Sequence, residues 1–280
     1  MNGKMFSSQP VRNLLSQTGI IILAVVWLLP FVWMLSTALK PNAEVFQSPP
    51  SIFGSSIEWG NFPAAWTFVP FGRFMFNGAF VSASGTSLVL VTSILCGYAF
   101  ARVKFWRREQ VFLLYLGTLM IPQEVTVVPL FLLMKYLGWV NTYQALILPW
   151  AFTAFGTFLL RQFFLTIPAD FEEAARLDGA TRWQVLWHVI VPLARPAIAV
   201  LALFTFISYW NSFLWPLIVG NTRELATIPV GLNLFSGQHG TQWNYMMAAS
   251  TISILPTAIL TLVLQKYIIE GISISGFGGR

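Results

Sequence analysis

The stretch PADFEEAARLDGATRWQVLWHVIVP, residues 168–192, is a charged segment set between long apolar runs. Asp170 and Glu173 have the spacing of an N-cap residue and its partner three positions further on. Thr181 and Gln184 repeat that spacing, and the glycine between the two pairs can take the left-handed backbone that ends a helix. The stretch therefore predicts two short helices joined by a glycine turn.

The first predicted helix has a charged face and a largely small apolar face. Glu172 and Glu173 can each reach Arg176 at helical neighbour spacing. The apolar face consists of Phe171, Ala174, Ala175 and Leu177. The second predicted helix has an apolar stripe of Trp183, Leu186, Trp187 and Ile190. From these features alone, the hairpin can rest on a membrane surface or dock against a partner protein.

The rest of the chain has the composition of an integral membrane protein. Of its 280 residues, 56% are hydrophobic and 9% are charged, whereas about 25% of a soluble domain is charged. A helix needs roughly 20 apolar residues to cross a bilayer. Six runs meet that need: residues 19–39, 77–101, 111–133, 145–165, 198–219 and 246–264. We therefore predict an all-α membrane protein with six transmembrane helices.

Basic residues predict the orientation of the chain. Loops kept in the cytoplasm hold the excess of Lys and Arg. With the N-terminus in the cytoplasm, twelve of the sixteen basic residues fall on that side, and so does the hairpin. The predicted parts are a cytoplasmic tail at 1–15, a transmembrane domain at 16–270 and a second cytoplasmic tail at 271–280. Topology thus accounts for the net charge of +6, and no nucleic-acid partner is expected.

The sequence contains no catalytic motif. Cys96 is the single cysteine, and the two histidines, His188 and His239, fall on opposite sides of the membrane in this topology, so no metal site is expected. Neither a phosphate-binding glycine loop nor a catalytic triad motif is present. We therefore expect a protein that is not an enzyme and holds no cofactor of its own.

Two regions of the predicted spans carry groups suited to a polar substrate. Glu124 lies between Pro122 and Pro129 in the third run, and an acid inside a membrane marks a pathway unless a neighbouring helix binds it. Four candidates for contact with sugar rings lie in the fifth run: Tyr209, Trp210, Asn211 and Trp215. Packing between helices is the alternative for both regions.

The hairpin resembles the EAA loop of binding-protein-dependent ABC importer permeases. It has Glu173-Ala174-Ala175, three residues, Gly179, nine residues and a close at Pro192 in which valine replaces the usual isoleucine and leucine. Other segments are similar, in order and spacing, to carbohydrate permeases of the type of the G subunit of the maltose transporter: Lys40-Pro41 with Glu44, Asn77, residues 98–102, Ile121-Pro122, residues 128–130, Trp210-Asn211 and Gly271. The resemblance covers nearly the whole chain and departs in the tail at 274–280.

The resemblance implies the type I ABC importer permease fold, with the hairpin as the coupling helix on the cytoplasmic side. It implies half of a translocation pore in a heterodimer with a second permease, two ATPase subunits that use ATP and Mg, and an external substrate-binding protein. The residues implied in coupling to the ATPase are Glu172, Glu173, Ala174, Ala175, Asp178 and Gly179. The implied location is a bacterial or archaeal cell membrane.

The implied cargo is a sugar, such as an oligosaccharide. Import of glycerol phosphate or another polyol derivative is the alternative within the family, and a proton-coupled secondary carrier that uses Glu124 is the rival class. The outward loop at 221–245 is implied in contact with the binding protein, unless it is an ordinary solvated loop. Its candidate residues are Gly237, Gln238, His239 and Gly240.

Overall fold

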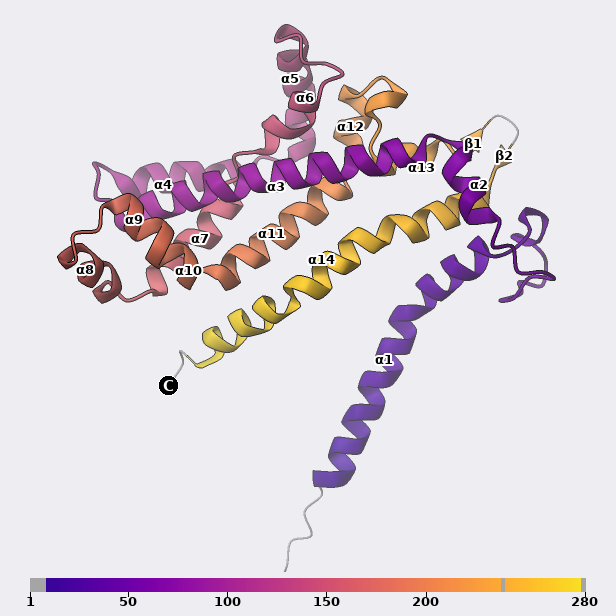
Figure 1. Ribbon diagram of the computed structural model, residues 1–280, viewed down its shortest axis with the longest axis horizontal. Helices are drawn as coiled ribbons and strands as arrows, with labels where there is room; N and C mark the ends of the chain where they lie inside the picture. The colour runs from indigo at the N-terminus through magenta and orange to yellow at the C-terminus, as the bar shows by residue number, and fades with distance from the viewer. Residues whose placement is uncertain (1–8, 238–239, 278–280) are drawn as a thin grey trace, which may run out of the picture. The chain divides into compact units, whose positions relative to one another are not determined.

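The computed structural model describes residues 9–237 and 240–277, and nearly all of its elements are helices (Figure 1). The chain divides into two compact units, one of residues 1–68 with 235–252 and one of residues 69–234 with 253–280. Within the described ranges, strands occur only as the antiparallel pair β1 (Ser236–Gly237) and β2 (Gly240–Thr241). The predicted all-α fold is confirmed.

The first unit contains α1 (Gln9–Ala38), η1 (Asn42–Glu44), α2 (Asn61–Phe68) and the start of α14 (Trp243–Phe277). The buried side chain of Asn61 connects them. Its Nδ2 donates to the carbonyl oxygens of Ala38 and Lys40, both at 2.9 Å. Asn244 Nδ2 in turn donates to Asn61 Oδ1 at 3.1 Å. Because a buried amide must find partners, this one residue ties the end of α1 to the starts of α2 and α14.

Glu44 fastens the loop between α1 and α2. Its carboxylate accepts hydrogen bonds from the hydroxyl of Ser55 and, at 2.8 Å, from the backbone N–H of Ser55. The hydroxyl and then the backbone N–H lower the pKa of Glu44 below its ordinary value, because both bonds favour the charged carboxylate. The loop is therefore clamped while Glu44 is ionised.

The second unit is organised along α3 (Phe71–Arg102), which packs against α7 (Ala154–Thr166) and α11 (Arg195–Trp210). Small residues on α3 permit this approach, since a Cβ on Gly85 would lie 2.4 Å from the ring of Tyr209. The other elements of this unit, besides the end of α14, are α4 (Arg108–Gly117), η2 (Thr118–Met120), α5 (Gln123–Tyr136), α6 (Tyr143–Ile147), η3 (Leu148–Trp150), α8 (Asp170–Leu177), α9 (Arg182–Val185), η4 (Leu186–Ile190), α10 (Val191–Leu193), α12 (Leu214–Val219), η5 (Arg223–Leu225) and α13 (Ile228–Asn233).

Six spans can be counted in the part of the chain that the structure describes. Three single helices are long and apolar enough to cross a membrane: Ser16–Ala38, Phe71–Arg102 and Trp243–Tyr267. Three bent pairs also qualify when each counts as one span: Arg108–Met120 with Gln123–Tyr136, Tyr143–Trp150 with Ala154–Thr166, and Arg182–Leu193 with Arg195–Trp210. The predicted number of spans is confirmed. Helices α1 and α14 also extend into the predicted tails at 1–15 and 271–280.

Three of the predicted runs are interrupted rather than continuous, and the fourth bends by 45° between Trp150 and Ala154. The third bends by 96° at Ile121-Pro122, because proline has no backbone N–H and disfavours a helical backbone at the residue before it. The fifth run, predicted at 198–219, is helical only to Trp210 before α12 begins as a separate element. Its span instead takes in the second half of the hairpin, across a bend of 79°.

Candidate functional site

The hairpin at 168–192 forms two helical halves around a glycine turn. Gly179 has a φ of +87°, in the left-handed region that favours glycine. Thr181 and Gln184 form a capping box: Gln184 N donates to Thr181 Oγ1 at 3.3 Å, and Thr181 N donates to Gln184 Oε1 at 2.8 Å. The predicted glycine turn and the cap of the second half are both confirmed.

Asp170 does not cap the first half of the hairpin, so that prediction is wrong. The N-cap position is taken by Ala169, whose backbone is already helical (φ −64°, ψ −26°), and Asp170 becomes the first helical residue of α8. No side chain caps this end. Three carboxylates in the first turn still favour it, because negative charge near a helix N-terminus is stabilising.

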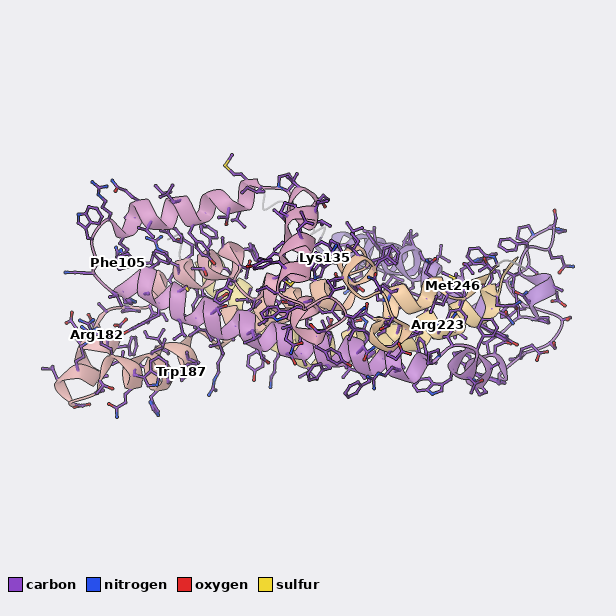
Figure 2. The ribbon with its side chains drawn as sticks, turned by 90° about the horizontal axis from the view of Figure 1, so that it is seen from above. Phe105, Lys135, Arg182, Trp187, Arg223 and Met246 are labelled. Carbon is purple, nitrogen blue, oxygen red and sulfur yellow. The ribbon has the colours of Figure 1, made fainter. Side chains whose placement is uncertain are left out.

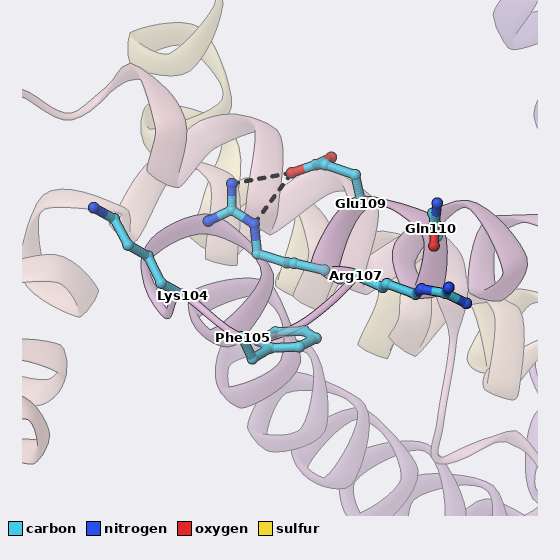
Figure 3. A pocket seen from close by; sticks show the side chains of 6 residues that line it. Lys104, Phe105, Arg107, Glu109 and Gln110 are labelled. Carbon is cyan, nitrogen blue, oxygen red and sulfur yellow. Dashed lines mark hydrogen bonds and ion pairs between the residues drawn. The ribbon is translucent and has the colours of Figure 1, made fainter.

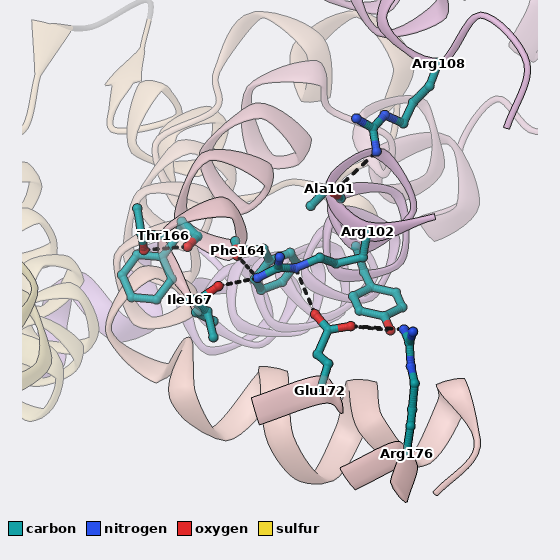
Figure 4. Close-up of polar contacts among 10 residues, drawn as sticks. Ala101, Arg102, Arg108, Phe164, Thr166, Ile167, Glu172 and Arg176 are labelled. Carbon is teal, nitrogen blue, oxygen red and sulfur yellow. Dashed lines mark hydrogen bonds and ion pairs between the residues drawn. The ribbon is translucent and has the colours of Figure 1, made fainter. Parts of the chain in front are cut away.

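Glu172 is only 4% exposed and lies among side chains of α3 and α8 (Figure 4). Its Oε1 lies 2.8 Å from Arg102 Nε, an ion pair without hydrogen-bond alignment, and its Oε2 lies 3.3 Å from Arg176 Nη2. The hydroxyl of Tyr98 donates to the same Oε2 at 3.5 Å. A buried carboxylate is costly unless it is paired, so these partners fix Glu172 against the end of α3. We call Tyr98, Arg102, Glu172 and Arg176 the anchor cluster.

Arg102 extends the anchor cluster to α7. Its Nη2 donates to the carbonyl oxygen of Phe164 at 2.7 Å and to that of Ile167. Carbonyl groups at the end of a helix have no partner within the helix, so a guanidinium from outside can satisfy them. One side chain therefore links the last turn of α3, the end of α7 and the first turn of α8.

The remaining surface of the hairpin is open. Leu177 and Trp183 are 89% and 61% exposed although they are apolar. Exposed apolar groups beside carboxylates suit a protein partner that offers apolar pockets and basic side chains. We call the following exposed residues the docking face: Phe171, Glu173, Ala174, Leu177, Asp178 and Trp183.

The structure separates the residues that were predicted to couple to an ATPase. Glu173, Ala174 and Asp178 lie on the docking face, whereas Glu172 is held inside the chain. Ala175 is half-buried, and the glycine makes the turn. Coupling itself stays a prediction for all six residues. In the sequence, only the resemblance to the EAA loop set Glu173 apart from Glu172. The burial of Glu172 had one available signal, Arg102, which ends a span with a charge that needs a partner.

The four residues predicted to form one apolar stripe on the second half of the hairpin are also divided between buried and exposed positions. Leu186 and Ile190 are buried against the ends of the spans, but Trp183 is exposed and contacts Trp187 edge-on at 5.7 Å. The prediction assumed α-helical spacing throughout, whereas η4 is a π-helix with more residues per turn. The change of spacing explains why the four residues do not share one face.

Three of the four candidates for sugar contact pack inside the protein. Tyr209, Trp210 and Trp215 are buried, with their polar hydrogens satisfied. They donate to the backbone carbonyl oxygens of Ile147, Ser253 and Ala145, at 2.9, 3.1 and 2.8 Å respectively. Buried tyrosine and tryptophan side chains commonly find such a partner. Their arrangement therefore supports the packing alternative.

Glu124 and Asn211 remain accessible. Glu124 is exposed in the first turn of α5, directly after the 96° bend, and Asn211 is exposed at the end of α11. Among the described residues, neither side chain has a hydrogen bond or ion pair. Polar groups at a break in a span are tolerated where they face a cavity or other protein. These two residues are the remaining candidates for a substrate path.

Asn77 is a buried polar residue near the start of α3 whose contacts the sequence did not predict. Its Nδ2 donates to the carbonyl oxygens of Glu224 at 2.9 Å and Ala226 at 2.8 Å. The hydroxyl of Tyr143 donates to its Oδ1 at 2.7 Å. Asn77 thus holds α3, α6 and the loop after α12 together. The sequence showed Asn77 as an amide at the start of an apolar run and as one of the positions that resemble carbohydrate permeases, but it did not show these contacts.

Two of the four candidates for contact with a binding protein belong to the pair of strands. Gly237 belongs to β1 and Gly240 to β2. Gln238 and His239 lie outside the described residues. Contact with a binding protein stays a prediction for all four.

Residues of the second unit that are predicted to lie on opposite sides of the membrane are found toward opposite ends of that unit (Figure 2). Figure 2 shows Phe105, Arg182 and Trp187 at one end, with Lys135 and Arg223 toward the other. The loop at 103–107 and the hairpin therefore share one end of this unit. The assignment of that end to the cytoplasm stays a prediction.

Comparison with known proteins identifies similar chains. Residues 90–274 match the sequence family described as binding-protein-dependent transport system inner membrane component. The chain is 34% identical over 273 residues to the trehalose/maltose transport system permease protein MalG of Thermococcus litoralis, covering 96% of this chain and 98% of that protein. It is 33% identical over 276 residues to the sn-glycerol-3-phosphate transport system permease protein UgpE of Pectobacterium atrosepticum, with the same coverage of 96% and 98%.

The fold is also similar to that of a solved transporter. A chain from the crystal structure of a bacterial ABC transporter involved in the import of the acidic polysaccharide alginate superposes with a TM-score of 0.82 and 25% sequence identity. The match covers 96% of this chain and 100% of that chain. The predicted type I permease fold is thereby confirmed.

Proposed function

Because the chain belongs to the family of binding-protein-dependent transport system inner membrane components, we propose that it is the permease subunit of an ATP-driven ABC importer of a sugar. It is a membrane-embedded transport subunit and not an enzyme, and ATP hydrolysis belongs to partner ATPase subunits. The observation that carries the proposal is the hairpin, in which buried Glu172 is anchored to the spans while neighbouring Glu173 is exposed. A hairpin of this kind can bind a partner and transmit its movement.

We assign the docking face to an ATPase subunit. Within the described residues Glu173 forms no ion pair, so its carboxylate is open to a basic side chain of that subunit. Exposed Leu177 and Trp183 would fill apolar pockets beside it. A second permease would complete the pore, and a substrate-binding protein would deliver the sugar from the other side of the membrane. ATP and Mg bind to the ATPase subunits in this scheme, so this chain needs no cofactor.

The anchor cluster supplies the route from the docking face to the spans. Closure of two ATP-bound ATPase subunits would move the docked hairpin as one body. Arg102 connects that body to α3 and α7, and the second half of the hairpin leads directly into α11. Displacement of the hairpin would therefore tilt three packed helices together, which is how a pore can open alternately to its two sides.

A sugar suits the chain better than a phosphate ester. A bound phosphate group would call for basic side chains along the path. Arg161 in α7 is buried and already holds both oxygens of Glu109, at 2.9 and 2.8 Å. The accessible candidates, Glu124 and Asn211, offer hydrogen bonds to hydroxyl groups. Glycerol phosphate is the second candidate cargo, because the similarity to the Pectobacterium permease is of the same degree as that to the maltose-type permease.

The test is sugar uptake coupled to ATP hydrolysis in proteoliposomes that contain this chain, its partner permease, the ATPase subunits and the binding protein. Glu173→Ala should leave the complex assembled but lower uptake by about ten-fold or more, because a charge-assisted contact is lost. Asp170→Ala is the matched control, since it removes an exposed acid from the same turn outside the docking face. Normal uptake by Glu173→Ala would refute the docking assignment. Uptake of glycerol phosphate without sugar uptake would replace the proposed cargo.

A further inference from the structure

An open pocket of about 450 Å³ lies at the loop between α3 and α4 (Figure 3). No residue of the anchor cluster or the docking face contributes to it. Three of its six lining side chains are basic and one is acidic. The lining residues are Lys104, Phe105, Arg107, Arg108, Glu109 and Gln110.

The pocket keeps a positive charge after its internal ion pairs are formed. The carboxylate of Glu109 lies 3.0 Å from Arg108 Nη2 and 2.8 Å from Arg161 Nη2, so two arginines already compensate it. In the described part of the chain, exposed Lys104 and Arg107 have no acidic partner within ion-pair distance. These two cations are therefore open to an anionic ligand.

Aromatic rings stand beside those cations. Trp106 is 78% exposed, and Phe105 is also exposed. The guanidinium of Arg107 lies 4.1 Å from the centre of the Trp106 ring. The backbone of Arg107 has a φ of 56°, in the left-handed region where few residues other than glycine are found. Exposed tryptophan next to basic residues is typical of proteins at the level of lipid headgroups.

The loop has a defined place relative to the membrane. It joins the span that ends at Arg102 to the bent pair that begins at Arg108. A five-residue connection between two spans lies at the membrane surface, within reach of the headgroups. We propose that this pocket binds the phosphate of an anionic phospholipid, with Lys104 and Arg107 holding the phosphate and Trp106 lying against the lipid. A water-soluble phosphate would leave the aromatic half of the site unused.

The proposal can be tested by native mass spectrometry of the complete complex, purified and incubated with phosphatidylglycerol or phosphatidylcholine. The wild-type complex should retain phosphatidylglycerol in preference to phosphatidylcholine. Lys104→Gln with Arg107→Gln should weaken its binding about 30-fold, because each basic residue at a membrane surface contributes roughly five-fold. Lys135→Gln with Arg223→Gln is the matched control, since it removes one exposed lysine and one exposed arginine at the other end of the unit. The control should bind lipid as the wild type does.

Several results would overturn the proposal. Equal retention of the two lipids by the wild-type complex would do so. The same loss of phosphatidylglycerol in the control variant as in the Lys104/Arg107 variant would also do so, because it would reflect total charge alone. Displacement of the lipid by inorganic phosphate alone would identify a site for free anions. Loss of ATPase subunits from the Lys104/Arg107 variant with unchanged lipid retention would make the loop a protein contact. Trp106→Ala, which keeps both cations, should weaken lipid binding by a smaller factor, and unchanged lipid binding would remove the aromatic half of the site.

Discussion

Replacement of Arg102 by leucine should detach the hairpin from the spans while leaving the docking face intact. The change removes the 2.8 Å ion pair with Glu172 and leaves that carboxylate buried with Arg176 and a tyrosine hydroxyl. It also removes the side-chain donor to two carbonyl groups at the end of α7. Both losses fall at the one side chain that joins three helices.

The expected cost follows from the burial of the pair. Breaking a buried ion pair from one side costs about 3–5 kcal/mol, because a charge is left without its partner. The side chains of Arg102 and Glu172 are 15% and 5% exposed, so solvent screens this contact little. Arg176 still reaches the carboxylate but is 48% exposed, so we expect the lower limit, about 3 kcal/mol. Glu172→Gln should cost about 1–2 kcal/mol, since the amide is neutral and Arg102 keeps its carbonyl partners.

The assay is a double-mutant cycle on the two residues, measured by reversible unfolding in mixed detergent micelles. The two changes should be coupled by about 1 kcal/mol or more. Arg108→Leu is the matched control, because the Arg108–Glu109 pair is 28% and 57% exposed and should contribute less than about 1 kcal/mol. In proteoliposomes, Arg102→Leu should retain the ATPase subunits but hydrolyse ATP without sugar uptake. Additive effects in the cycle, or coupled uptake at the wild-type rate, would refute the reasoning.

Three further changes test other parts of the structure. Gly85→Ala should destabilise the second unit by about 1–3 kcal/mol in the same unfolding assay, because the added Cβ would lie 2.4 Å from the Tyr209 ring. Gly117→Ala is the control and should be nearly neutral, because a Cβ added there has no atom within 4 Å. The lowered pKa of Glu44 in the folded state means that its loop clamp stabilises the fold above the ordinary pKa of a glutamate and is lost as pH falls through the lowered value. Protection of the Ser55 amide from hydrogen exchange should therefore fall in acid in the wild type and be absent at every pH in Glu44→Ala, which has no acceptor. Glu124→Gln should alter the rate of sugar uptake more than the amount of assembled complex, and an unchanged rate would assign this acid to packing.

Features set by neighbouring residues could be predicted from the sequence. The capping box of Thr181 and Gln184 and the left-handed turn at Gly179 depend on residues a few positions apart. The number of spans depends on the length of apolar runs. The prediction failed by one position at Asp170, because the choice between capping residue and first helical residue was decided by the backbone of the alanine before it.

Features set by tertiary contacts could not be predicted in this way. Tyr209, Trp210 and Trp215 have the side chains of a sugar site, yet each donates to a backbone carbonyl of its own chain. Those acceptors become available only when α6 and α14 pack beside α11 and α12, which no local spacing reveals. Arg102 and Glu172 likewise lie far apart in the sequence and meet only because α8 folds back onto the end of α3.

The two adjacent glutamates explain why the hairpin can connect a partner at the docking face firmly to the spans. Neighbouring residues of an α-helix point about 100° apart, so one carboxylate can be buried in the chain while the next faces a partner. Glu172 is fixed to the ends of α3 and α7 through Arg102, and Glu173 is exposed one position further along the same helix. Because less than one helical turn separates the two, little flexible chain lies between a force applied at the docking face and the spans that must move. The small side chain that follows, Ala174, is exposed and adds no flexible stem at this point, so a partner can approach the helix backbone closely.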